Sequence, residues 1–244
     1  MSNNYLDKVK KYFWFSSKEF NGFILTTVIF AFIYSFDSWG IITFNLSEGL
    51  FNLFIAVLLC GFSLFVHHAG QRLVALHYGF KTTHKVWWPG IIIALLLAFL
   101  TKGHFEMYAA SAVFITLMPH HRIGKVRPGE NIGALGKISA AGPVSNVILA
   151  SLAVILTWIG ILPESISHPI FMFNLYFAVW NLLPFPPLDG SRVLFYSRLF
   201  YIFFITSILG YILLIWLLGV YSYIFALIIG IVSWFLFYWF FESK

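Results

Sequence analysis

The chain has 244 residues, of which 60% are hydrophobic and only 10% are charged, and its mean hydropathy is +0.88. Soluble domains carry about 25% charged residues, so this composition excludes a water-soluble globular protein. The net charge is +6, but the basic residues are scattered over short loops. This scatter favours a role in membrane orientation and argues against nucleic-acid binding. The single cysteine, Cys60, excludes an intrachain disulfide.

Residues 1–19 are expected to form a cytoplasmic N-terminal segment, and residues 20–241 a single transmembrane domain. The first segment is polar and basic with several aromatic residues, and it shows no signal-peptide cleavage pattern. A short amphipathic helix in the membrane interface and a frayed tail are both compatible with it.

Six segments are apolar and close to the length of about 20 residues that a helix needs to cross a bilayer core of about 30 Å. They are 20–36, 50–68, 138–161, 170–183, 199–218 and 221–241. Two shorter stretches, 86–101 and 105–118, are predicted to form a tight helical pair, with a buried re-entrant hairpin as the alternative. The sequence therefore predicts an all-α, multi-pass integral membrane protein with six to eight membrane segments, eight being preferred.

The basic residues predict the orientation of these segments. With eight alternating crossings and a cytoplasmic N-terminus, only Lys102 of the 15 Lys and Arg residues falls on the outer side. Cytoplasmic loops carry an excess of Lys and Arg, so both termini are predicted to be cytoplasmic. A re-entrant unit at 86–118 leaves this orientation unchanged.

Polar side chains within membrane segments usually face a cavity or a partner, and two such clusters stand out. His67, His68 and Gln71 lie at the inner end of the second crossing, and 181–190, with three prolines and Asp189, at the inner end of the sixth. On a helix, His67 and Gln71 share a face because they are four residues apart. The prolines interrupt the sixth helix, so Asp189 is expected to reach the His67 face from a loop.

These clusters resemble the site-2 proteases, which are intramembrane zinc metalloproteases. The family pattern is H-E-x-x-H on one helix, then A-G-P-x-x-N, then N-x-L-P-x-x-x-L-D-G. This chain reads H-H-A-G-Q from His67, A-G-P-V-S-N at 141–146 and N-L-L-P-F-P-P-L-D-G at 181–190. The similarity in order, spacing and membrane placement covers about residues 50–194.

The resemblance implies roles only where residues match. His67 takes the position of the first zinc-binding histidine and Asp189 that of the third ligand, and Asn146 and Asn181 take positions that shape the substrate cleft. The other two central positions depart from the family pattern, because His68 replaces the general-base glutamate and Gln71 the second zinc histidine.

These replacements change the expected chemistry. A catalytic zinc ion has three protein ligands, and the amide oxygen of Gln71 is a poorer ligand than imidazole, so zinc binding is expected to be weakened or absent. His68 is a conceivable general base or a metal ligand. His120 and His121 lie on the same predicted side, but histidines at the lipid–water boundary are the preferred interpretation, as they are for His77 and His84.

Three functions follow. The leading hypothesis is a pseudoprotease with lost or weakened peptidase activity that binds transmembrane client proteins within the lipid bilayer. The second is an active intramembrane zinc metalloprotease with an altered ligand set. The third, a transporter, is compatible with the broken sixth helix, but the polar residues cluster at one end of the segments and no repeated halves are visible.

Overall fold

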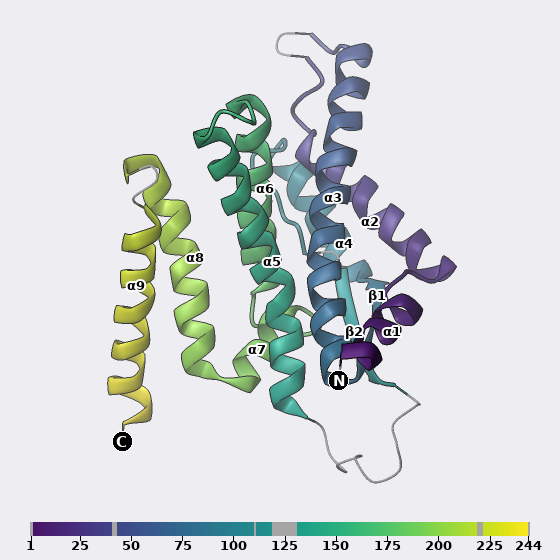
Figure 1. The fold of residues 1–244 in the computed structure, drawn as a ribbon. Coiled ribbons are helices and arrows are strands. Elements are labelled where there is room, and N and C mark those ends of the chain that lie inside the picture. Colours follow the sequence, from purple (N-terminus) through teal and green to yellow (C-terminus); the bar gives the residue numbers. More distant parts are fainter. Residues whose placement is uncertain (1, 41–42, 110, 119–130, 219–221, 244) are drawn as a thin grey trace.

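The computed structural model describes residues 2–40, 43–109, 111–118, 131–218 and 222–243. It is a helical bundle in which α3 and α5 lie side by side at the centre (Figure 1). Within the described residues, four helices are long and apolar enough to cross a membrane. The prediction of a largely α-helical, multi-pass membrane protein is therefore confirmed.

The N-terminal half of the chain forms one side of the bundle. Its helices are α1 (Ser2–Tyr12), α2 (Ser17–Tyr34) and α3 (Leu46–Tyr78). The N-terminal segment is thus helical, as one of the two sequence interpretations held. Helix α3 has 33 residues, about 50 Å at 1.5 Å per residue, so it is longer than the bilayer core. Asn45 caps its start through Ser47 and Glu48, and Gly79, at φ +82°, ends it.

A two-stranded sheet replaces one helix of the predicted pair. Strand β1 (Phe80–Val86) leads into helix α4 (Trp88–Leu100), and strand β2 (Ser111–Leu117) pairs antiparallel with β1. The expected helix at 105–118 is therefore wrong, because its second half is a strand. A short apolar run fits either structure by periodicity, and pairing with β1, which the sequence interpretation missed, decides between them.

The β1–α4–β2 unit starts and ends beside the lower end of α3 in Figure 1. At its far turn, a Cβ on Gly103 would lie 3.2 to 3.3 Å from Phe36 and Asp37, just beyond the end of α2. The unit therefore extends along the length of α2, and its chain then returns to pair β2 with β1. Its extended return stretch contains Tyr108 and Ala109, which are fully buried, and non-helical backbone is tolerated at membrane depth where protein covers it.

The C-terminal half supplies α5 (Ile132–Trp158), α6 (Glu164–Asn181), α7 (Asp189–Tyr196), α8 (Arg198–Leu218) and α9 (Ser222–Phe237), followed by a π-helical turn, η2 (Tyr238–Glu242). Helices α8 and α9 form a hairpin at the edge of the bundle (Figure 1). The sequence interpretation placed α5, α6, α8 and α9 but did not expect α7 to be a separate short helix.

Two large apolar clusters hold the bundle together, beside a smaller one between α3, β1 and α5. One joins α2, α3, α4 and α6 around Phe30, Leu64, Tyr108 and Phe177. The other joins α5, α6 and α8 and includes Leu182. The polar residues of interest lie where α3, α5, α6 and α7 meet, between these clusters. The fold thus surrounds a few buried polar side chains with tightly packed helices.

Candidate active site

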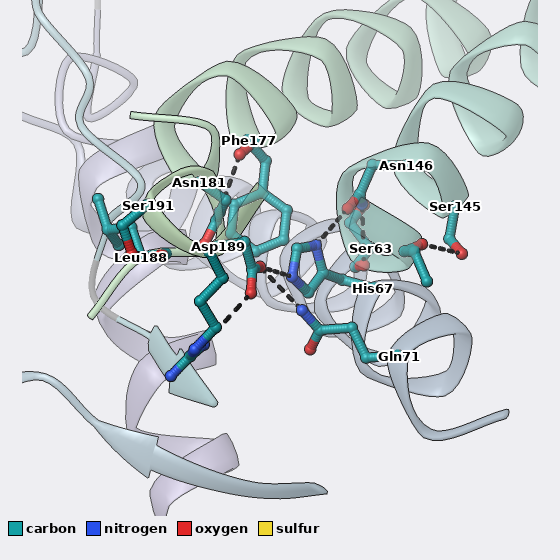
Figure 2. A network of polar contacts seen from close by, with 12 residues as sticks. Ser63, His67, Gln71, Ser145, Asn146, Phe177, Asn181, Leu188, Asp189 and Ser191 are labelled. Carbon is teal, nitrogen blue, oxygen red and sulfur yellow. Dashed lines mark hydrogen bonds and ion pairs between the residues drawn. The ribbon is translucent and has the colours of Figure 1, made fainter. Parts of the chain in front are cut away.

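His67, Gln71 and Asp189 form one buried cluster (Figure 2). His67 Nε2 lies 3.1 Å from Asp189 Oδ2, and Gln71 Nε2 donates to the same oxygen over 2.8 Å. His67 and Gln71 are each 1% exposed and Asp189 is 3% exposed. The structure therefore brings together the first motif and the L-D-G motif, which are separated by more than 100 residues.

The backbone around Asp189 explains how the carboxylate reaches His67. Asp189 is the first residue of α7, immediately after the proline-containing link. A negative side chain is favourable at the start of a helix. A Cβ on Gly190 would lie 1.9 Å from the Leu182 carbonyl oxygen. Only glycine therefore allows α7 to begin so close to the end of α6.

Helices α3 and α5 approach each other closely at the same place. A Cβ on Gly142 would lie 2.4 Å from His67 Nε2 and 2.8 Å from Gln71 Nε2. A Cβ on Gly70 would lie 1.9 Å from Ser145 Oγ. The two glycines carry no side chain, so the polar faces of α3 and α5 can meet. Gly142 is the glycine of the A-G-P motif.

Asn146 orients the His67 ring. The Asn146 Nδ2 group donates to Asn174 Oδ1 over 2.7 Å and to the Ser63 carbonyl oxygen over 3.2 Å. Its Oδ1 atom therefore faces His67 Nδ1, at 2.6 Å. Because Oδ1 only accepts hydrogen bonds, Nδ1 carries a proton and donates. The Nε2 atom is left to face Asp189, and it donates to the carboxylate when the ring carries a second proton, as an imidazolium.

Asn181 does not join this network through a hydrogen bond to His67 or Asp189. Its Nδ2 group donates to the Phe177 carbonyl oxygen within α6 over 2.8 Å, and it is 2% exposed. The Phe177 ring itself lies 4.9 Å from the His67 ring, centroid to centroid. Residues of α6 therefore line the cluster, and Asn146 binds His67 and is held by Asn174, whereas Asn181 bonds within α6.

His68 contacts residues of other elements, although it also interacts with His67 and Gln71. Its ring centroid lies 4.7 Å from that of His84 on β1, and 6.4 Å from those of Phe15 and Phe23. These neighbours come from the α1–α2 link, α2 and β1, whereas the partners of His67 come from α5, α6 and α7. The difference follows from the helix, in which adjacent residues are rotated by about 100°.

His84 corrects the interpretation of a boundary histidine. It is 3% exposed and its backbone N–H donates to Glu19 Oε1 over 3.1 Å. Burial lowers the pKa of His84 to about 4, so the ring is neutral at pH 7. His77, by contrast, is exposed and packs against Tyr5. His120 and His121 lie outside the described residues.

Several site residues were missed in the sequence. Asn174 and Ser63 carried a signal, because each is polar within an apolar segment. Arg192 Nη1 lies 3.9 Å from Asp189 Oδ1, a role that the general use of basic residues for membrane orientation does not predict. Beside His68, Arg72 and Glu19 form an ion pair of 2.7 Å with both side chains 3% exposed.

The donor set can be compared with that of a zinc centre. Two ligands on one tetrahedral zinc ion lie about 3.4 Å apart, so the 3.1 Å between His67 Nε2 and Asp189 Oδ2 suits a shared ion. Within the part of the chain that is described, however, no three His, Cys, Asp or Glu side chains converge. Gln71 turns an N–H group toward the carboxylate, and Arg192 places a positive charge on its other side. These residues do not fit a three-ligand zinc centre.

Comparison with known proteins identifies the family of the chain. The chain is 32% identical, over 205 residues, to a protein of Methanocaldococcus jannaschii named "Putative zinc metalloprotease". The match covers 82% of this chain and 96% of that protein. The chain belongs to this metalloprotease family. No protein-family model and no solved structure matches it.

Family membership makes the donor set informative. The scaffold of this metalloprotease homologue holds His67 and Asp189 in contact, and the third side chain on the cluster is the amide of Gln71. The Gln71 side chain also interacts with the His68 ring, although its buried Oε1 atom makes no hydrogen bond of good geometry. A buried acceptor without a partner is costly, so Gln71 is held here by packing and by its bond to Asp189.

Proposed function

We propose that the chain is a site-2-protease-like pseudoprotease, with peptidase activity lost or much weakened, that binds transmembrane segments of client proteins. One observation carries the loss of activity. The Gln71 amide donates to the Asp189 carboxylate over 2.8 Å, at the position where the family pattern has a second zinc-binding imidazole. The similarity to a putative zinc metalloprotease would favour zinc-dependent proteolysis. The side chains around Asp189 in this chain argue against zinc-dependent proteolysis.

The general-base position supports the same proposal. His68 replaces the glutamate of the motif, and its ring neighbours are Phe15, Phe23 and His84. A general base must lie within hydrogen-bond reach of the proton that it removes, or be connected to it by one water. The His68 ring also lies 5.4 Å from the His67 ring and interacts with the Gln71 side chain, so Gln71 stands between it and Asp189. The absence of the family's carboxylate base at this position therefore supports weakened activity, and Gln71 supports it at the second ligand position.

Client binding is proposed because the rest of the scaffold is intact. The glycines and amides that bring α3, α5 and α7 together remain, although two chemically central residues have changed. A buried polar network within the membrane is expensive to maintain, so its retention suggests a continuing use. Recognition of a transmembrane segment requires this scaffold but no bound metal.

The proposal is tested first on the wild-type protein purified in detergent. Zinc content is measured by mass spectrometry, and cleavage is followed on single-span membrane substrates with and without a chelator. We expect far less than one zinc per chain and no chelator-sensitive cleavage. Near-stoichiometric zinc together with chelator-sensitive cleavage would overturn the proposal.

The double variant His68→Glu/Gln71→His provides the matched gain-of-function test. Gln71→His alone is expected to raise zinc occupancy, because it supplies a third strong donor beside His67 and Asp189. Only the double variant is expected to cleave. The triple variant that also carries Asp189→Asn is the control and is expected to lose the added zinc.

Client binding is measured separately, by fluorescence energy transfer between the labelled wild-type protein and labelled single-span peptides in nanodiscs. Saturable binding that an unlabelled peptide displaces is the expected result. If a varied set of such peptides gives only the signal of random mixing, client binding is rejected.

An active enzyme with an altered ligand set is the second candidate, because one observation favours it. His67 Nε2 and Asp189 Oδ2 converge at 3.1 Å, and the Gln71 Oε1 atom beside them is buried and unbonded. Rotation of this amide would turn an oxygen toward them. Under this hypothesis, His67→Ala and Asp189→Asn each abolish wild-type cleavage, and turnover that survives either change rejects it.

A further inference from the structure

A groove outside the polar cluster runs along the start of α8. It consists of three adjoining hollows of about 550, 360 and 410 Å³ that all include Ser197, the residue between α7 and α8. Two of them share Phe200. The residues that line the groove include those from the first turns of α5 and from α8 and α9, and Figure 1 shows where these helices lie. The groove is therefore a continuous depression on the edge of the bundle.

One end of the groove is polar and mainly cationic. Arg198 and Glu242 line the largest hollow, and Lys137 lines the neighbouring one on α5. All three side chains are exposed. The Lys137 ammonium lies 5.6 Å from the Tyr78 ring centroid, and no ion pair engages Arg198 within the described residues. Arg198 and Glu242 therefore charge this end, and Lys137 lines the hollow beside it.

The other end of the groove is apolar. Phe200, Phe203, Ile231 and Trp234 line the hollow between α8 and α9. Tyr196 lies over α5, where a Cβ on Gly136 would come within 2.2 Å of it. This close packing of Tyr196 on Gly136 fixes one side of the groove. The polarity therefore changes from charged to hydrocarbon-like along the direction of α8.

We propose that this groove binds one anionic phospholipid, with the phosphate beside Arg198 and Lys137 and an acyl chain along Phe200, Phe203 and Trp234. The change from charge to hydrocarbon matches a lipid, whose head is polar and whose tails are not. The depth matches as well, because Arg198 is the first residue of a helix long and apolar enough to cross a membrane. The cations would therefore lie at headgroup level.

This occupant fits better than a transmembrane helix or a second copy of the chain. A helix presents apolar side chains along its length but leaves Arg198 and Lys137 without a negative partner. An anionic headgroup supplies that charge, and clustered Lys and Arg residues at the membrane surface attract such lipids by about 1 kcal/mol each, which is about fivefold in affinity. Glu242 opposes it by repulsion.

The test counts lipids bound to the detergent-solubilised protein by native mass spectrometry. Phosphatidylglycerol and phosphatidylcholine with identical acyl chains are titrated separately. We expect one phosphatidylglycerol to bind in preference to phosphatidylcholine. Arg198→Gln and Lys137→Gln should each weaken that binding about fivefold, whereas Glu242→Gln should strengthen it.

Lys10→Gln and Lys11→Gln are the matched controls. They remove a positive charge from α1, at the same end of the chain's fold but outside the groove, and should leave the binding unchanged. Equal binding of the two lipids, equal effects of the control and groove variants, or a dimer that forms in place of lipid binding would each overturn the proposal.

Discussion

His67 illustrates how one hydrogen bond sets the chemistry of a buried side chain. Its Nδ1 atom is fixed as a donor because Asn146 turns Oδ1 toward it, and Asn146 is itself held by Asn174 and Ser63. The Nε2 atom is thereby directed to Asp189. The amides of Asn174 and Asn146 thus determine which ring nitrogen of His67 faces the carboxylate.

Asn174 is the residue through which this arrangement can be tested. In Asn174→Leu, the Asn146 amide loses its 2.7 Å acceptor, and loss of a buried hydrogen-bond partner costs about 1–3 kcal/mol. We expect a lower thermal unfolding temperature in detergent. Ser151→Ala, which removes a bond within α5 alone, is the control and should have a smaller effect. Equal losses in both variants would contradict the role of Asn174.

His84 predicts a pH dependence of stability. Its pKa is lowered by burial to about 4, whereas an unfolded histidine has a pKa of about 6.5. The neutral ring is favoured in the folded state, so the stabilising contribution is complete above pH 6.5 and is lost as the pH falls from 6.5 toward 4. The full loss is at most about 3 kcal/mol.

The measurement for His84 is urea or thermal unfolding at pH 7.5 and pH 5 in the same detergent. His84→Phe is expected to reduce the difference between the two pH values. His104→Gln changes an exposed histidine of the loop after α4 and should retain that difference. An unchanged difference in His84→Phe would show that other groups cause the pH dependence.

At the scale of elements, the start of α2 is fastened to α3 by a buried ion pair. Ser16 and Glu19 form a capping box at the start of α2, and Glu19 also binds Arg72. Arg72 donates to the Phe13 carbonyl oxygen over 2.7 Å and lies 4.0 Å from the Phe15 ring centroid. The residues that make these contacts pack on the side of α3 that carries His68.

Glu19→Gln is expected to destabilise the protein strongly. Breaking a buried pair from one side leaves an uncompensated charge and costs about 3–5 kcal/mol, whereas the double variant Glu19→Gln/Arg72→Met should recover part of this loss. Unfolding in detergent measures both. Lys18→Gln, beside Glu19 and exposed, is the control. If the double variant is less stable than Glu19→Gln, the pair is not the source of the effect.

At the scale of the whole molecule, α1 and η2 lie toward the same end of the bundle (Figure 1). The turn of the β1–α4–β2 unit at Gly103 lies beside the far end of α2. This arrangement is compatible with the predicted orientation, in which both termini face the cytoplasm and Lys102 faces the outside. The number of membrane crossings and the two sides remain predictions.

Cysteine labelling tests these sides with little background, because the single cysteine, Cys60, is fully buried. In intact cells, a membrane-impermeant maleimide should label Lys102→Cys but neither Lys10→Cys nor Glu242→Cys. In inverted vesicles the pattern should reverse, while the wild type stays unlabelled. Labelling of Lys10→Cys in intact cells would show that the orientation is wrong.

The apolar segments and their helical structure were predictable because composition and length record them locally. Segments 50–68 and 199–218 lie within α3 and α8, and segment 138–161 overlaps α5, which ends at Trp158. The expected approach of His67 to Asp189 also followed from the sequence, through the interrupted sixth helix and the spacing of the motifs. Both inferences use local signals, namely the apolar periodicity of a segment and the prolines that interrupt a helix.

The tertiary structure decided the remaining features. The pairing of β1 with β2 and the bonds of Asn174 and Arg72 each join segments far apart in the chain. Local periodicity carries no information on which distant backbone or side chain completes a hydrogen bond. By itself the sequence thus determined a membrane helix bundle with a degenerate metalloprotease motif, and packing determined which polar groups meet inside it, because buried polar groups must find partners wherever the fold supplies them.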